Sequence, residues 1–313
     1  MGYGSKMKRI TYTQKWILFF IIICLSVICL FTYTYFRYRY NNSSYKINYL
    51  YFASDKCYIE KNNKITYLPI FNDINANFIY YCYYDSDNEN ILFKVHYDTV
   101  SDEKWWIYDN RKYELLDIPS SAVANLFNGY VYYAMVHKNS VLISRINIKT
   151  REKEENYMTI RNIPSEYDIE SVSITSDKIL ICADDLKYYE NITAYVYNMN
   201  GKCIFKKDHI STATFSKYGD ILWIDTNVKI FVKNLEKNTL RSYRTFYPMI
   251  DSQFSYEVSS AFMISHNKII STFSAFPSKK LCVVLVDINN HDFKVKQLKY
   301  SFPTRMWQHV IPF

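Results

Sequence analysis

One strand–turn–strand unit recurs along most of this chain, and this recurrence restricts the possible folds more than any other feature. Each copy is an aromatic or β-branched strand that ends in an Asp or Asn turn and is followed by a shorter, more polar strand. The copies are Trp106–Tyr113, Arg145–Thr150, Tyr195–Lys202, Phe231–Lys237 and Leu285–Asn290. Aligned on Asp109, Asn147, Asn198, Asn234 and Asp287, they lie 38, 51, 36 and 53 residues apart. A repeat of this size predicts an array of small antiparallel sheets.

An apolar strand precedes each copy, and we expect it to line the inner edge of its sheet. These strands are Phe78–Tyr81, Tyr130–Tyr133, Lys178–Ile181, Asp220–Asp225 and Lys268–Ser271. Each unit then holds about four strands, and sheets of this size bury their faces only by packing against one another. Gly is scarce, so Asn and Asp are expected to form the turns, because both residues tolerate left-handed backbone.

Two of these segments resemble blades of β-propeller domains. The run Asp220–Asp225, followed by Ile230 and Leu235, is similar to a degenerate YWTD-type blade. Trp106–Asp109, followed by Leu115, is similar to the end of a WD-type blade. The resemblance covers nearly all of residues 45–313 and implies an all-β propeller of about six four-stranded blades, with seven as the alternative. A β-sandwich or two smaller β domains are the other folds that the pattern allows. In a propeller, we expect residues 45–52 to close the ring by joining the blade of residues 293–300.

The N-terminal part contains an uncharged apolar run, residues 16–36, without Gly or Pro. As a helix this run is long enough to cross a bilayer, so the sequence predicts one transmembrane helix that contacts membrane lipid. Residues 1–15 are then a basic cytoplasmic tail, residues 37–44 a linker and residues 45–313 the propeller domain. The predicted location is the cell membrane, crossed once, with the C-terminal domain outside. Basic residues on both sides of the run favour this orientation only slightly.

Charge and cysteine spacing exclude several classes of function. Residues 1–40 contain six of the 38 basic residues and none of the 30 acidic ones, which leaves a formal charge of +2 for the remainder. The domain therefore lacks the basic excess of a nucleic-acid-binding protein, and we expect no nucleic-acid partner. The seven Cys are scattered without a C-x-x-C motif, which indicates neither a zinc site nor a disulfide framework.

No motif for catalysis, a cofactor or a metal is recognisable. Only three Gly lie beyond the apolar run, which excludes a P-loop and a dinucleotide-binding fingerprint. The segment Asp85–Asn90 spaces its carboxylates like a calcium loop but lacks the required Gly and the final Glu, so a hairpin turn is the better interpretation. We therefore expect no catalytic, cofactor-binding or metal-binding residues, and a chain that is not an enzyme.

The most polar and aromatic loop is the best candidate for a binding site. It contains Asp184, Asp185, Tyr188, Tyr189 and Glu190. The sequence thus favours a membrane-anchored propeller that acts as an extracytoplasmic binding or scaffolding module, with a protein or glycan bound at one face. Two alternatives are an accessory subunit of a membrane or envelope complex and an anchored extracytoplasmic hydrolase that uses carboxylates at a central channel.

Overall fold

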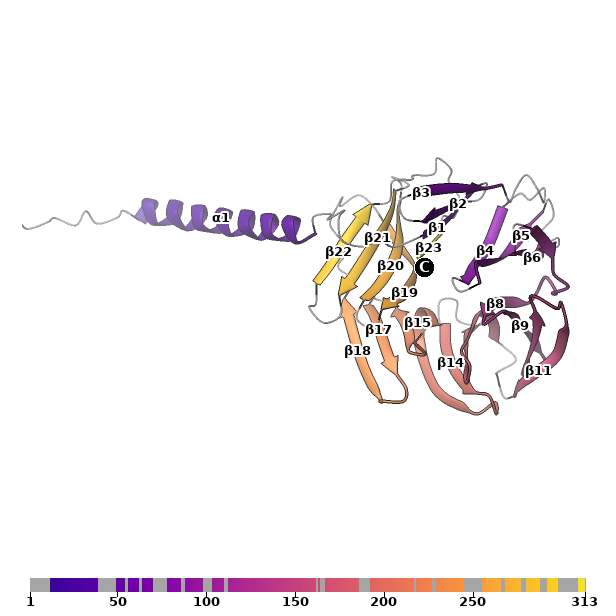
Figure 1. Cartoon of the computed structure of the whole chain (residues 1–313). Helices are drawn as coiled ribbons and strands as arrows, with labels where there is room; N and C mark the ends of the chain where they lie inside the picture. Colours follow the sequence, from indigo (N-terminus) through magenta and orange to yellow (C-terminus); the bar gives the residue numbers. More distant parts are fainter. Residues whose placement is uncertain are drawn as a thin grey trace, which may run out of the picture.

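The described part of the chain forms one helix and a set of small sheets arranged around a common centre (Figure 1). The computed structural model describes residues 12–38, 49–53, 56–61, 64–69, 78–85, 88–97, 103–109, 112–161, 163, 167–185, 192–216, 218–226, 229–244, 255–265, 268–276, 280–287, 292–297 and 309–312. The helix, α1 (Tyr12–Tyr38), contacts β22 (Asp292–Gln297) and extends away from the sheets.

Four sheets contain four antiparallel strands each, and we number them as units by their order along the chain. Unit 1 contains β23 (His309–Pro312), β1 (Tyr49–Ala53), β2 (Lys56–Lys61) and β3 (Lys64–Leu68). Unit 2 contains β4 (Phe78–Asp85), β5 (Asn90–His96), β6 (Glu103–Asp109) and β7 (Lys112–Leu115). Unit 3 contains β8 (Val123–Phe127), β9 (Tyr130–His137), β10 (Ser140–Asn147) and β11 (Lys153–Arg161). Unit 6 contains β19 (Ser255–Ser265), β20 (Lys268–Phe276), β21 (Lys280–Asp287) and β22.

The fifth sheet has seven strands and consists of two units that share one long strand. Its order is β12 (Tyr167–Ile174), β13 (Lys178–Asp185), β14 (Ile192–Asn198), β15 (Cys203–Phe215), β16 (Ile221–Asp225), β17 (Lys229–Asn234) and β18 (Thr239–Arg244). The first part of β15 pairs with β14, and the second part pairs with β16. His209 has a positive φ of 57° where the strand changes partner, next to Ile210. We therefore treat β12–β15 as unit 4 and β15–β18 as unit 5.

Strands near the centre of the ring contact one another in a closed cycle, which the pairing of β1 with β23 completes within unit 1. Contacts join β1 to β4, β4 to β8, β8 to β12, β12 to β15, β15 to β19 and β19 to β23. Figure 1 shows the corresponding ring, with the C-terminus inside it. The four-stranded sheets thus resemble propeller blades, which confirms the all-β, propeller-like fold predicted from the sequence.

The strand that closes the ring differs from the predicted one. Residues 49–52 of β1 pair with residues 309–312 of β23, so strands from both ends of the domain share unit 1, as expected. The predicted partner, residues 293–300, instead includes most of β22, whose residues pair with β21 as the outer strand of unit 6. Because that segment completes its own hairpin, the closing strand has to come from residues farther along the chain.

The inner-edge prediction is wrong for most units, whereas the turn prediction is confirmed. Residues 130–133, 178–181, 221–224 and 268–271 lie in second strands, and residues 78–81 lie in an inner strand. At the repeat's turns, the Asn147 side chain accepts the backbone N–H of Thr150 at 3.0 Å, and the Asn234 side chain accepts that of Lys237 at 2.7 Å. These local bonds supply the turn geometry without Gly.

Apolar side chains fill the spaces between neighbouring units. Phe93 and Leu50 belong to a cluster between units 1 and 2, while Trp105 and Tyr133 belong to one between units 2 and 3. All four side chains are almost completely buried. The outer strand β11 is instead mostly exposed and charged at its start, which protects an edge strand from pairing with other chains.

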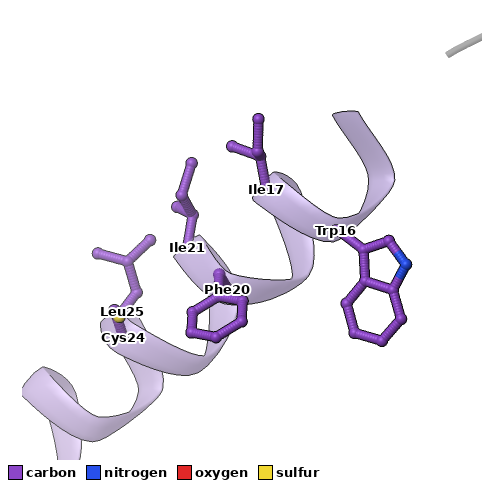
Figure 2. A pocket seen from close by; sticks show the side chains of 6 residues that line it. All are labelled: Trp16, Ile17, Phe20, Ile21, Cys24 and Leu25. Carbon is purple, nitrogen blue, oxygen red and sulfur yellow. The ribbon is translucent and has the colours of Figure 1, made fainter. Parts of the chain in front are cut away.

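The N-terminal apolar run forms α1, but the membrane prediction made from it is contradicted. Figure 2 shows apolar side chains of α1, including Trp16, Phe20 and Leu25, which border a shallow groove. Among the residues that the structure describes, no helix is long and apolar enough to span a bilayer. By this criterion the predicted lipid contact of residues 16–36 and the single-pass localisation are wrong. The side chains of Leu18 and residues 31–36, and the backbone of residues 1–11 and 39–48, lie outside the described part.

Candidate functional site

Hydrogen bonds between inner strands hold units 3, 4 and 5 together. The Asn125 side-chain amide donates to the Val172 carbonyl at 2.7 Å, which joins β8 to β12. The Phe215 N–H donates to the Ser173 hydroxyl oxygen at 3.1 Å, which joins β12 to β15. These bonds satisfy polar groups at the inner edges of the sheets and join neighbouring units near the centre of the ring.

The structure places only part of the predicted binding loop. Asp184 and Asp185 are the last two residues of β13, at one end of unit 4. The other predicted residues, Tyr188, Tyr189 and Glu190, lie outside the described residues. The two described residues of the predicted loop are therefore held by the hydrogen bonds of strand β13.

Strand pairing brings two further carboxylates to Asp184, and the sequence analysis missed both. Asp168 pairs directly with Asp184, and Glu170 lies where the register shifts between Ile169 and Ser171. We call Asp168, Glu170, Asp184 and Asp185 the acidic rim. The sequence pattern of a β12–β13 hairpin could have predicted the acidic rim. In a hairpin, residues at equal distances from the turn, here residues 175–177, lie opposite each other.

The acidic rim concentrates negative charge at a strand end where Asp168 and Glu170 are exposed and Asp184 and Asp185 are half-buried. Burial raises the pKa of Glu170, and the charges of Asp184 and Asp168 raise it further. The Oδ1 atom of Asp184 is shielded from solvent and accepts no hydrogen bond within the described part of the chain. A partner with N–H donors or positive charge would relieve both conditions.

The described residues do not provide a metal site. Among them, no group of three His, Cys, Asp or Glu side chains is placed to hold a metal ion. At the rejected calcium loop, β4 and β5 form a hairpin in which the Asn88 amide donates to the Asp85 carboxylate at 2.8 Å. Asp85 thus takes part in the turn itself.

Two cation–aromatic clusters were also absent from the sequence analysis. The Lys94 ammonium lies 2.6 Å from the Glu103 carboxylate and 5.7 Å from the centre of the Trp105 ring. The Arg145 guanidinium lies 4.0 Å from the centre of the Tyr157 ring. Each cluster joins strands of one sheet, so we assign both a structural role.

Comparison with known proteins places the chain only by its fold. No family model matches it. A protein of Acanthamoeba polyphaga mimivirus whose name gives it a BTB/POZ domain is 27% identical over 126 residues, which are 36% of this chain and 25% of that protein. The chain thus spans about a quarter of the length of this curated relative.

Three solved structures are similar in shape at 12% identity each. The WD40 β-propeller domain of Doa1 has a TM-score of 0.49, and the match covers 85% of this chain and 86% of that one. A prolyl endopeptidase has a TM-score of 0.48, with coverage of 81% and 42%. An oligogalacturonate lyase in complex with manganese has a TM-score of 0.46, with coverage of 71% and 65%. At such low identity, the likeness concerns the path of the chain and not its chemistry.

These similarities correct one prediction. From the absence of catalytic motifs we expected that the chain is not an enzyme. Two of the three similar structures belong to enzymes, a lyase and an endopeptidase, and this contradicts that expectation.

Proposed function

We propose that the chain is a six-bladed β-propeller that binds another protein through the acidic rim of unit 4 and the adjoining residues Tyr188, Tyr189 and Glu190. The observation that carries this proposal is the closed cycle of contacts between inner strands. A closed ring of sheets has a rigid frame and leaves the connecting loops to vary, and loops on such frames commonly carry function.

The charge of the acidic rim defines the partner's chemistry. Partial burial and the charges of Asp184 and Asp168 raise the pKa of Glu170, and a nearby cation would offset both effects, so a segment rich in Lys or Arg is the best match. The tyrosines of the adjoining loop add aromatic surface, which is common where proteins bind proteins. Binding of this kind depends on salt concentration, because opposite charges steer the association.

A capture experiment with matched variants tests this proposal. The full-length chain is immobilised beside the variants Asp184→Asn/Asp185→Asn and Asp117→Asn/Glu236→Gln, and proteins retained from the source cells are quantified by mass spectrometry. We expect the rim variant to lose a partner that the wild type and the second variant retain, because all of the changed residues are acidic but only two lie at the rim. Identical sets of retained proteins for all three chains would contradict the proposal.

A further inference from the structure

The N-terminal half of α1 carries a groove along one side, and α1 alone supplies both of its walls (Figure 2). Side chains four residues apart on a helix form a row, and two neighbouring rows enclose a groove between them. The rows here are Trp16, Phe20 and Cys24 in one and Ile17, Ile21 and Leu25 in the other. The groove has a volume of about 470 Å³.

The lining of the groove is apolar and exposed. Its five large side chains are between 49% and 65% exposed, and Cys24 is exposed as well. Residues 16–36 carry no charge, so a charged segment would find no opposite charge to pair with here. A continuous apolar surface of this kind marks a site of contact with another macromolecule.

The shape of the groove fits a helix better than a small molecule. Ligand pockets enclose most of the ligand and orient it with a few polar groups. A groove on the surface of one helix cannot enclose a ligand, and its lining is almost entirely apolar. It can instead receive a row of side chains from a second helix, which is how packed helices interlock.

The α1 helix of a second copy carries rows of the required kind. Helices that interlock through rows of this spacing cross at about −50°, with their axes about 8–10 Å apart. The rows that border the groove are themselves such rows, so two copies related by a twofold axis can each place one row in the groove of the other. Figure 1 shows α1 extending away from the sheets, which leaves room for a second chain to approach it.

The exposed area is large enough for a specific contact. At about 200 Å² for a fully exposed large side chain, the lining of the groove exposes on the order of 500 Å² in each copy. A pair of copies would bury on the order of 1,000 Å² in total, which is the size at which specific interfaces begin.

We propose that two copies of this chain associate through the grooves of their α1 helices. The row formed by Ile17, Ile21 and Leu25 of one copy packs into the groove of the other, and the rings of Trp16 and Phe20 cover the contact from the side. This association does not depend on the acidic rim, which belongs to unit 4. It would bring two acidic rims into one assembly.

Sedimentation velocity of the purified full-length chain over a wide range of concentrations tests the proposal. We expect the wild type to change from monomer to dimer as the concentration rises, without larger species. The variant Ile17→Asn/Ile21→Asn places two amides in the groove, where the contact would bury them without partners. We expect it to raise the dissociation constant of the dimer at least about tenfold.

The variant Ile22→Asn/Ile23→Asn is the matched control. Each residue advances about 100° around a helix, so these two positions lie on the side of α1 away from the groove. Their side chains are also exposed, and the change in composition is the same. Its dissociation constant should therefore change less than about twofold. Circular dichroism of both variants checks that the fold is kept.

Three outcomes would overturn the inference. A monomer at every concentration would exclude self-association. Equal effects of the two double variants, or a continuous series of larger species, would indicate general adhesion of apolar surface and not a defined contact. Flotation of the wild type with phosphatidylcholine vesicles in place of dimerisation would assign the lining to lipid. Failure of the capture experiment at the acidic rim would leave the dimer unaffected, so the two proposals can fail separately.

Discussion

Two joints of the ring are built in opposite ways. Between units 4 and 5, the 13-residue strand β15 continues from one unit into the next, and the chain itself is the connection. In unit 1, the four residues of β23 pair with β1 from the other end of the domain. The first joint cannot separate without distortion of a covalent strand, whereas the second is held only by hydrogen bonds and packing.

This difference indicates where the ring opens. Local unfolding starts where few interactions have to break, so we expect the seam at β1 and β23 to open more often than the joint at β15. Apolar packing beside both joints is otherwise similar, since Leu50 of β1 and Ile210 of β15 are each completely buried. The comparison therefore isolates the effect of chain connection.

Removal of the closing strand should have the largest effect. A chain that ends at residue 308 lacks β23, which leaves the inner edge of β1 unpaired and the core at unit 1 exposed. We expect a loss of more than about 4 kcal/mol in the free energy of unfolding, measured by urea titration. A chain that lacks only Phe313 is the control. An unchanged urea midpoint for the shorter chain would show that the seam does not hold the ring closed.

Cavities at the two joints should be equally destabilising but should open different regions. Leu50→Ala and Ile210→Ala each remove a completely buried aliphatic side chain, which costs about 2–5 kcal/mol. In hydrogen exchange followed by mass spectrometry, we expect Leu50→Ala to speed exchange in β1 and β2 by local opening. Ile210→Ala should leave exchange in β15 tied to global unfolding. Local opening of β15 in Ile210→Ala would contradict the expectation that the continuous strand prevents this joint from opening by itself.

Two buried thiols report on the same joints without mutation. Cys57 of β2 pairs with Phe52 of β1, and the Cys182 thiol contacts the Ala213 carbonyl of β15 at 3.6 Å. Burial raises the pKa of both thiols, that of Cys182 to about 11, so alkylation at pH 8 requires opening.

We expect an alkylating reagent to label Cys57 at least about tenfold faster than Cys182, because the seam opens more readily. Peptide mass spectrometry after timed quenching measures both rates in one sample. The exposed Cys203 serves as the control for reagent reactivity. Equal rates at Cys57 and Cys182 would mean that both joints open together.

What the sequence could predict follows from how local each feature is. The turns at Asn147 and Asn234 are formed by bonds to residues two or three positions away, and the repeat was therefore visible. The seam depends on pairing between residues 49–52 and 309–312, and many short strands compete for such a distant partner. The preceding strand β22 alternates apolar and charged residues, whereas the four residues of β23 are too few to form such a pattern, so the pattern favoured the wrong strand.

The candidate site was only half predictable for the same reason. Asp184 and Asp185 stand out because they follow a run of apolar residues in one strand. Asp168 and Glu170 join them only through the register of β12 against β13, including its local shift.

The smallest expected effect concerns charge repulsion at the acidic rim of unit 4. The pKa of Glu170 is raised in the folded chain, so the folded state binds its proton more tightly than the unfolded state. Stability therefore falls as pH rises through the titration of this group.

Glu170→Gln should stabilise the chain at pH 7 by up to about 0.5 kcal/mol, since the group is exposed, and the gain should vanish below about pH 4. Urea titrations at pH 7 and pH 4 measure both values, with Glu236→Gln as the control. A gain that persists at pH 4 would assign the effect to packing and not to charge.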